Sequence, residues 1–465
     1  MRPSRFLMAM FSCWFVLPFA LTVSLAALAQ TVTTTLEFDT TNGRYPQLQP
    51  LTQGRDGNII GVVSGDGPGG YGYVYRERPG TGVVKTLYNF GYLSGYGAEG
   101  SVTLARDGNY YGTVSAGGTY NFGNLFRLSP SGIFTSLDDF SNGADGAQPI
   151  AAPIEASDGN LYGTTSGGNT TSATVYKYTA GGVFSVIYTL TDSSFITSPV
   201  LEGSDGSLYL IDGGGQYPCG AILKMTKAGL LESTHNFDCN GQGSGPVGQL
   251  FEGSDGFIYG ATRYGGQDNL GVAYRVDPAT LLETVLHNFG SSSNDGYYSY
   301  AGVAQGSDSN FYGTTSQGGD YTCGTIYQLT PSGIYTQIYS FPCSVFGLPN
   351  PFAAPYQNTN GKFFGGTLTG GDFGFGTLYT LDMGLGPFIT FVHAQGKIGA
   401  TAQILGQGFA GATSVTFNGV PAARFAVVKD TFMTAVVPSG ATTGRVVVTT
   451  PTRALTSNKN FSVSQ

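Results

Sequence analysis

The sequence has 465 residues, enough for two or three domains, and a formal net charge of −8. Only 11% of the residues are charged, 13% are aromatic and 73 are glycine. A disordered chain is excluded because it needs high charge and few aromatic residues, and a collagen is excluded because the glycines have no three-residue period. Gly, Thr, Ser and Tyr are also weak helix formers, so the composition indicates an all-β protein with many tight turns.

Residues 1–29 have the pattern of a secretory signal peptide. Arg2 and Arg5 precede an apolar stretch, and Ala27-Leu28-Ala29 fits the small-x-small rule for cleavage before residue 30. An uncleaved membrane anchor is the alternative, since the apolar stretch is long enough to span a bilayer. Cleavage would leave four cysteines in an oxidising compartment. We find no second apolar stretch long enough to span, so any attachment to a surface is expected to be indirect.

A pattern Asp-Gly-x-apolar-Tyr-Gly recurs about every 50 residues, which with four short strands per unit is typical of a β-propeller. It starts at Asp56, Asp107, Asp158, Asp205, Asp255, Asp308 and, in altered form, Asn360. In the second repeat, strands are expected at 101–105, 110–114, 124–128 and 134–140. The last repeat has only three strands, so residues 32–38 are predicted to supply its fourth and to close the ring. Residues 30–385 are therefore predicted to form a seven-bladed β-propeller.

Two pairs of cysteines flank predicted hairpins at equal distances from the central glycine: Cys219 and Cys239 about Gly229, and Cys323 and Cys343 about Gly333. Facing residues of an antiparallel hairpin have this symmetry, so each pair is predicted to form a disulfide within one blade. Each would close a loop of about 20 residues and contribute roughly 3 kcal/mol. A four-cysteine zinc site is the alternative, but it needs closely spaced pairs that the sequence lacks.

The sequence pattern changes after a break at 383–387. Seven short apolar-alternating stretches in residues 386–465 predict a β-sandwich. They lie at 388–392, 402–406, 414–417, 425–428, 433–437, 446–450 and 461–463. Charge also changes here: residues 30–385 hold 13 basic and 28 acidic side chains (−15), and the tail holds six basic and one acidic (+5). An acidic main body disfavours nucleic acid as a partner.

Two resemblances follow from these patterns. The tail resembles IPT/TIG immunoglobulin-like domains at Gly406-x-Gly408-Phe409, at 414–419, at Val437-Pro438-x-Gly440 and at 444–448. The 50-residue unit resembles the Gloeo/Verruco ("GloVer") tandem repeat at 158–165 and 323–329. Ile60, Leu210, Ser309 and Asn360 depart from that repeat. Together the resemblances imply a secreted bacterial surface or envelope protein with no established catalytic residue.

Few residues suggest chemistry. His235 and His287 occupy the fourth-strand position that Tyr88 fills in the first repeat, which favours a structural role. The Asp-Gly acids are explained by turn chemistry, with calcium binding as the alternative. Paired carboxylates for glycosidic cleavage remain possible, but one sequence selects no pair. No catalytic, cofactor-binding or metal-binding residue is therefore assigned, and no cofactor is expected.

The long connections between blades and between second and third strands are predicted to lie on one face. They are variable in length and rich in Tyr, Phe and Asp, which suits ligand binding on a rigid scaffold. The candidate ligand-face residues are Tyr92, Tyr96, Glu99, Tyr120, Phe122, Asp145, Tyr217, Asp268, Asp295, Tyr297, Tyr298, Tyr300, Asp320, Tyr321, Asp372, Phe373 and Phe375.

The expected function is non-catalytic binding or adhesion at the bacterial cell surface or envelope. A polysaccharide or a surface protein are both open as partners. A lyase or hydrolase using the loop carboxylates is the first alternative, and a structural spacer in a surface assembly is the second. Carboxylates converging in one pocket would favour the enzyme, and a broad aromatic face would favour binding.

Overall fold

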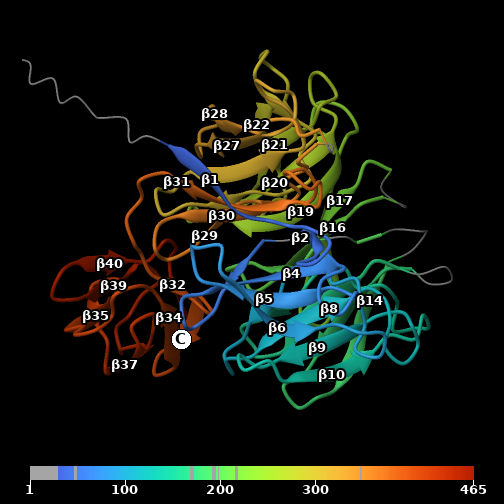
Figure 1. The fold of residues 1–465 in the computed structure, drawn as a ribbon. Coiled ribbons are helices and arrows are strands. Elements are labelled where there is room, and N and C mark those ends of the chain that lie inside the picture. Colours follow the sequence, from blue (N-terminus) through green and yellow to red (C-terminus); the bar gives the residue numbers. More distant parts are fainter. Residues whose placement is uncertain are drawn as a thin grey trace, which may run out of the picture.

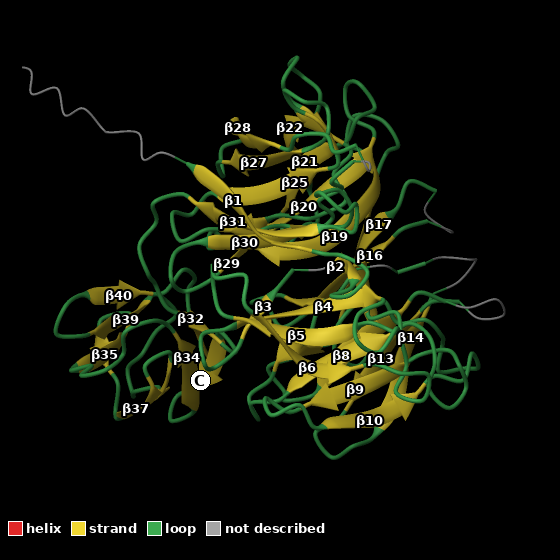
Figure 2. Ribbon diagram, in the orientation of Figure 1, coloured by secondary structure: helices red, strands yellow, loops and turns green. Residues whose placement is uncertain are grey.

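The computed structural model describes residues 30–46, 50–167, 172–190, 195–196, 198–214, 218–345 and 348–464 (Figure 1). The predicted signal peptide and Tyr217 lie outside the described residues. Figure 2 shows strands and loops in this part of the chain and no helix. The all-β prediction is confirmed for the described residues.

Seven antiparallel sheets follow one another along the described part of residues 31–382, with their strands in sequence order. The first contains β2 (Arg44–Pro46), β3 (Thr52–Gln53), β4 (Ile59–Gly65), β5 (Tyr73–Glu77) and β6 (Val84–Asn89). The second contains β7 (Thr103–Leu104), β8 (Tyr110–Val114), β9 (Asn124–Leu128) and β10 (Phe134–Asp139). The third contains β11 (Ile154–Glu155), β12 (Leu161–Thr165), β13 (Thr174–Tyr178) and β14 (Phe184–Thr189).

The next three sheets repeat this arrangement. The fourth contains β15 (Leu201–Glu202), β16 (Leu208–Asp212), β17 (Ala221–Met225) and β18 (Leu231–Asn236). The fifth contains β19 (Ser244–Glu252), β20 (Ile258–Tyr264), β21 (Val272–Val276) and β22 (Glu283–Asn288). The sixth contains β24 (Ala304–Gln305), β25 (Phe311–Thr315), β27 (Thr325–Leu329) and β28 (Tyr335–Ser340), beside a ribbon of β23 (Gly296–Tyr297) and β26 (Gln317–Gly318).

The seventh sheet joins the two ends of this region. It contains β29 (Tyr356–Gln357), β30 (Phe363–Thr367), β31 (Thr377–Asp382) and, at its edge, β1 (Thr31–Glu37). β1 runs antiparallel to β31, with Thr31 opposite Asp382. The N-terminal strand therefore pairs with the last repeat, where the sequence placed it.

Contacts within each sheet explain the repeated motif. The motif tyrosine donates its hydroxyl to the turn aspartate, as Tyr259 does to Asp255 at 2.6 Å. The next residue, Gly260, lies against buried Tyr274 of the third strand, and a Cβ there would come within 2.4 Å of the Tyr274 hydroxyl. The turn glycine Gly256 has φ of +85°, a conformation that glycine adopts without strain. The motif is therefore a folding unit.

A glutamate or glutamine three residues before the turn links neighbouring sheets. Its side-chain oxygen accepts a hydrogen bond from a backbone N–H of the preceding sheet, as Glu202 does from Ser157 (2.8 Å). The same bond is made by Glu155 with Arg106, Glu252 with Ser204, Gln305 with Ser254, Gln357 with Ser307 and Gln53 with Thr359. The second sheet has Leu104 at this position, packed with Leu405 and Phe432 of the C-terminal region.

Two further sheets make up the C-terminal region, shown in red in Figure 1. One contains β32 (Thr390–Phe391), β34 (Thr401–Leu405), β38 (Phe432–Val436) and β37 (Phe425–Lys429); the other contains β36 (Val420–Pro421), β35 (Ser414–Phe417), β39 (Val446–Thr449) and β40 (Ala454–Thr456). β33 (Gln395–Lys397) pairs in parallel with β41 (Ser462–Ser464). Side chains of both sheets, including Ile404, Phe417 and Val448, share one buried core.

Several strands differ from the sequence-based prediction. The first strand of the second sheet has only two residues instead of five, because only Thr103 and Leu104 pair with β8. Its fourth strand ends at Asp139, and Phe140 is buried beyond it. β33, β36 and β40 were not predicted, because strands of two or three residues show no apolar alternation.

Candidate ligand-binding face

The C-terminal sheets contact the ends of the repeats that carry the Asp-Gly turns. Arg55, beside the first of these turns, donates to the Gln403 side chain at 2.7 Å, and Thr431 donates to the Arg55 carbonyl at 2.8 Å. The connections from second to third strand and from sheet to sheet leave the other ends of the strands. We call these connections the long-loop face. The scaffold therefore carries the C-terminal sheets on one side and the candidate residues on the other.

One strand of each of the seven sheets (β3, β7, β11, β15, β19, β24 and β29) also lines one cavity of about 400 Å³, together with Phe391, Leu405 and Lys459 of the C-terminal region. Its walls are mainly aliphatic and amide side chains. Burial lowers the pKa of the Lys459 amine, and Glu252 opposes this shift. The cavity lies between the C-terminal region and the repeats, away from the long-loop face.

Arg263 at the end of β20 organises an aromatic group on the long-loop face. Its guanidinium carbon lies 4.8 Å from the ring centre of Tyr264 and 4.2 Å from that of Tyr300. Tyr264 meets Tyr298 edge to face at 5.6 Å, and Tyr300 stacks on Phe352 at 4.3 Å. Cation–π contacts of this kind contribute about 0.5–2 kcal/mol each. We call these five residues the Arg263 cluster.

The guanidinium of Arg263 donates no hydrogen bond to any described residue, and its Nε is buried. Three other arginines also have a buried Nε without a hydrogen bond, but each donates through another guanidinium nitrogen. Arg55 donates to Gln403, Arg106 to the Ala156 carbonyl and Arg275 to the Pro331 carbonyl. The two Nη atoms of Arg263 therefore keep their donors for a ligand, whereas its Nε is closed to solvent.

Arg263 also differs from the residue that most other repeats have at the equivalent position. The same position holds serine in four other repeats, and each serine donates to a carbonyl of the preceding connection: Ser64 to Tyr45, Ser115 to Gly97, Ser166 to Gln148 and Ser316 to Tyr298. A short side chain is thus sufficient for folding at this position. A long cation in its place adds nothing that the other repeats need, which points to a role outside the scaffold.

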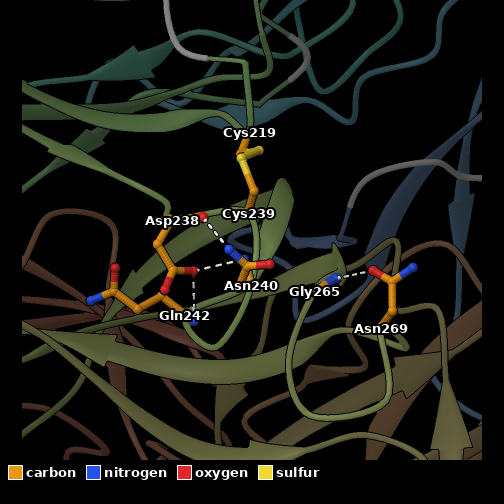
Figure 3. Close-up of a disulfide and its surroundings, with 7 residues drawn as sticks. All are labelled: Cys219, Asp238, Cys239, Asn240, Gln242, Gly265 and Asn269. Carbon is orange, nitrogen blue, oxygen red and sulfur yellow. Dashed lines mark hydrogen bonds between the residues drawn. A yellow bond between two sulfur atoms is a disulfide. The ribbon is translucent and has the colours of Figure 1, made fainter.

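A disulfide fixes the loops beside this cluster. Cys219 and Cys239 are bonded, as are Cys323 and Cys343, which confirms both predicted pairs. Figure 3 shows that the loop after Cys239 is held by Asp238, which accepts from the Asn240 and Gln242 backbone amides (2.8 and 2.9 Å). In the same view, Gly265 donates to Asn269 at 2.9 Å.

These two loops meet. A Cβ at Gly265 would lie 2.5 Å from Gly243, so glycine is needed for their close approach. Gly265 follows Tyr264 directly in the chain. The loop that follows Arg263 and Tyr264 is therefore braced by a disulfide-bonded neighbour.

A second aromatic group lies further round the long-loop face. The rings of Tyr71 and Tyr96 are 5.5 Å apart, and Tyr92 stacks on Tyr96 at 6.4 Å. Tyr71 is 41% exposed and Tyr92 is 53% exposed. Aromatic side chains that stay this open present flat apolar surface to the solvent.

The remaining candidate residues divide into exposed and packed ones. Tyr120, Tyr321 and Phe373 are more than half exposed, and Asp268, Asp320 and Asp372 are exposed as well. Phe122 and Phe375 pack against buried clusters, and Tyr297 contacts Tyr298 at 5.2 Å. Glu99 is half-buried, and burial raises the pKa of its carboxyl group. The structure thus brings Tyr92 and Tyr96 into one group and places Tyr298 and Tyr300 in the Arg263 cluster. Tyr120 and Tyr321 have no ring contact with either group among the described residues.

Two of the candidate acids are used inside the fold. Asp295 is buried and lies 2.8 Å from His287, and it also accepts from the Ser291 amide. Asp145 occupies the equivalent position after the second sheet, where it accepts from Ser141. In the second sheet, Asp138 occupies the position that His287 has in the fifth sheet, so an acid replaces a base. Burial, with Asp145 and Asp139 nearby, raises the pKa of Asp138 to about 6.

The other histidines are also paired with carboxylates. His235 lies 2.8 Å from buried Glu283, and His393 lies 3.3 Å from Glu202. Burial raises the pKa of Glu283. Within the described ranges, no three His, Cys, Asp or Glu side chains form a group that could hold a metal ion.

Sequence reasoning missed Arg263, Tyr264, Tyr71 and Asp138. Arg263, Tyr264 and Asp138 lie at the end of a strand, and Tyr71 lies in the loop between β4 and β5. A signal was present for two of them. Arg263 replaces the serine of other repeats, and Asp138 replaces a tyrosine or histidine, so an alignment of the seven repeats would mark both.

These sheets and the loops they carry define an all-β repeat protein with an aromatic face. The chain belongs to the family of the Gloeobacter/Verrucomicrobia repeat, whose model matches residues 19–209 and 195–422. No curated protein was found with significant sequence similarity to the chain. No helix among the described residues is long and apolar enough to cross a membrane.

Solved structures with a similar fold are enzymes of low sequence identity. A fungal alcohol oxidase of the AA5 family in complex with copper is 13% identical, with a TM-score of 0.53, and the match covers 94% of this chain and 99% of that chain. An oligogalacturonate lyase from Vibrio parahaemolyticus is 13% identical, with a TM-score of 0.49 and coverage of 76% and 93%. A luciferin-regenerating enzyme is 10% identical, with a TM-score of 0.42 and coverage of 77% and 98%. At 13% identity the likeness to the alcohol oxidase concerns the fold alone, and the other two matches, whose TM-scores are below 0.5, support no conclusion about this chain.

Proposed function

We propose that this protein is a secreted, non-catalytic binding protein of the bacterial cell surface or envelope, with its ligand on the long-loop face. The observation that carries the proposal is Arg263, a cation without hydrogen-bond partners held between Tyr264 and Tyr300. Binding sites combine apolar aromatic surface with a few placed polar groups. Polysaccharides and surface proteins are the ligands that fit an open aromatic face.

The scaffold that we propose for this face is a closed seven-bladed β-propeller. Three observations support it: β1 pairs with β31, one strand of each of the seven sheets lines one cavity, and Gln53 of the first sheet bonds to Thr359 of the last. For the C-terminal sheets we propose an immunoglobulin-like sandwich of the IPT/TIG type. Its support is the pair of four-stranded sheets with a common core.

Secretion is proposed from the pattern of residues 1–29 and from the two disulfides. Disulfides persist in oxidising compartments and are rare in the cytosol. The two bonds join Cys219 to Cys239 and Cys323 to Cys343.

A second candidate function is a carbohydrate-active lyase or hydrolase, and the Asp138–Asp145 pair favours it. Asp138 has a pKa raised to about 6 by burial and by the nearby carboxylates. A carboxylic acid with a raised pKa beside an ionised one is the arrangement that glycosidic cleavage requires. Asp145, however, accepts hydrogen bonds from Ser141 and Gly143, which hold it in its own loop. The binding function therefore has the stronger support.

Residues 30–465 would be mixed with a panel of soluble and insoluble polysaccharides, and bound protein and released sugars would be measured in the same samples. Binding without release is the expected result. Release of sugars that is lost in Asp138→Asn would favour the enzyme instead. If no polysaccharide is bound, the carbohydrate ligand is wrong, and a protein partner or a spacer role takes its place.

A further inference from the structure

We propose that the Arg263 cluster binds the carboxylate of an acidic sugar residue. This inference rests on the proposed binding function of the long-loop face and names its ligand class. Arg263 would donate two parallel hydrogen bonds to the carboxylate, and the neighbouring tyrosines would contact the sugar ring. Planar, two-point recognition of a carboxylate is the geometry that a guanidinium favours.

A negatively charged ligand suits Arg263, because this arginine has neither a counterion nor a neutral acceptor among the described residues. No carboxylate of the described residues lies within 4.0 Å of its guanidinium nitrogens, whereas Arg44, Arg76 and Arg106 each have an acidic partner. The two ring contacts at 4.8 and 4.2 Å stabilise the charge but leave the N–H donors unsatisfied. The Nε is closed to solvent, so the two Nη atoms, which donate to no described residue, are the donors that the carboxylate oxygens would meet.

The ligand also needs a ring-shaped apolar surface. Tyr264 is 38% exposed beside the cation, and Tyr298 lies against it at 5.6 Å. Tyr phenol rings can contact the C–H face of a sugar, and their hydroxyls can bond to its hydroxyl groups. An acidic sugar residue has both the carboxylate for Arg263 and the ring surface for the tyrosines.

A single carboxylate fits better than a polyphosphate or a nucleic acid. Residues 30–385 carry 28 acidic and 13 basic side chains, and this net negative field repels a densely charged polymer. A single carboxylate is attracted to Arg263 over a short contact distance. Salt screens the more distant acidic side chains, so their field weakens this attraction much less. The expected ligand is therefore an isolated or terminal uronic acid residue.

The cluster is held in place before a ligand binds. The Tyr298 amide donates to the Leu270 carbonyl at 3.1 Å, which joins the connection after the fifth sheet to the loop after β20. Tyr300 stacks on Phe352 of the following connection at 4.3 Å. Little ordering is then required on binding, which favours affinity.

The test compares a glucuronic-acid-containing oligosaccharide with its carboxyl-reduced, neutral counterpart by calorimetry, using residues 30–465. We expect the acidic oligosaccharide to bind at least about 10-fold more tightly, because hydrogen bonds from a guanidinium to a carboxylate are stronger than those to a neutral hydroxyl group. Arg263→Ser should remove that preference and still fold, since serine occupies this position in four other repeats. Arg263→Lys should keep part of it. Arg424→Ser is the matched control, an exposed arginine of the C-terminal sheets.

Each outcome distinguishes this inference from the proposed function. Equal binding of the acidic and neutral oligosaccharides, unchanged in Arg263→Ser, would overturn the carboxylate site and leave the binding function intact. If Arg424→Ser also lost the preference for the acidic oligosaccharide, the carboxylate site would be overturned, because the preference would then come from net charge. Absence of binding to any polysaccharide of the panel would overturn this inference and the carbohydrate ligand, and would leave a protein partner or a spacer role for the proposed function.

Discussion

Gln53 and Thr359 exchange two hydrogen bonds although 306 residues separate them in the sequence. The Gln53 amide donates to the Thr359 hydroxyl at 2.9 Å, and the Thr359 backbone N–H donates to the Gln53 carbonyl oxygen at 3.0 Å. Both residues are buried. The pair joins the first sheet to the last by the same bond that links other neighbouring sheets.

Gln53→Leu should lower the free energy of unfolding by about 2–3 kcal/mol, because it breaks both bonds and leaves the buried Thr359 N–H without an acceptor. Leucine is the residue found at the equivalent position Leu104. Chemical denaturation would measure the change. Gln305→Leu is the matched control for a link between neighbouring repeats, and a similar loss is expected there. Unchanged stability in Gln53→Leu alone would contradict a closed ring.

Removal of residues 30–38 should lower the Tm by about 10 °C or more, since it removes strand pairing and a buried phenylalanine worth roughly 3–5 kcal/mol. β1 pairs with β31 over Thr31–Glu37, and Phe38 is fully buried. Calorimetry would follow the transition. Phe38→Ala separates the lost packing from the lost pairing and should show the smaller decrease. A truncated chain with the Tm of the parent would show that β1 is dispensable.

Replacing Cys219 and Cys239 with serine should lower the free energy of unfolding by roughly 3 kcal/mol, the loop-entropy contribution of a bond that closes about 20 residues. The matched double variant of Cys323 and Cys343 should lose a similar amount. Only the first variant should also weaken ligand binding, because its loop braces the one that follows Tyr264. Equal effects on binding would argue against that coupling.

Asp138 should make stability depend on pH. Its carboxyl pKa is raised to about 6 from the ordinary value of 3.8, so the folded state favours the protonated form. The resulting stabilisation is complete below about pH 4 and is lost as the pH rises through 6. The free energy of unfolding of Asp138→Asn, relative to that of the parent, should therefore be about 1 kcal/mol higher at pH 8 than at pH 4. The difference is small because solvent screens a partly exposed group. Denaturation at several pH values would measure the difference.

Asp138→His extends this test, because it copies the His287–Asp295 pair of the fifth repeat. An imidazolium facing Asp145 should stabilise the fold below about pH 6.5, where histidine is charged. A variant less stable than the parent at pH 5 would mean that the two sites are not equivalent.

Phe432→Ala should loosen the C-terminal sheets from the repeats. Phe432 is buried beside Leu104, and the Arg55 guanidinium lies 4.6 Å from its ring centre. We expect a loss of about 3–5 kcal/mol and a separate unfolding transition for residues 386–465. Calorimetry with limited proteolysis would detect it. Phe425→Ala, a partly buried phenylalanine on the neighbouring strand β37, is the control and should leave one transition.

Much of the fold could be predicted because its information is local and repeated. Each Asp-Gly turn, its tyrosine and the following glycine act within one sheet, so the period alone marks the seven units. The disulfides followed for the same reason, since Cys219 and Cys239 face each other across one hairpin. The N-terminal strand could be placed because the last repeat lacks one.

The candidate site depends on contacts that have no period. Arg263, Tyr300 and Phe352 come from three different segments, and no spacing in the sequence predicts that they stack. The roles of Asp295 and Asp145 depended on whether the side chain facing each is a base or an acid.

Repeat pattern and pairing symmetry were thus readable from the chain, because short-range hydrogen bonds and glycine geometry determine them. Three-dimensional packing determined which turns the C-terminal sheets cover and which cation is left without a partner. Those features arise between residues far apart in sequence, where loop conformation and burial select the neighbours.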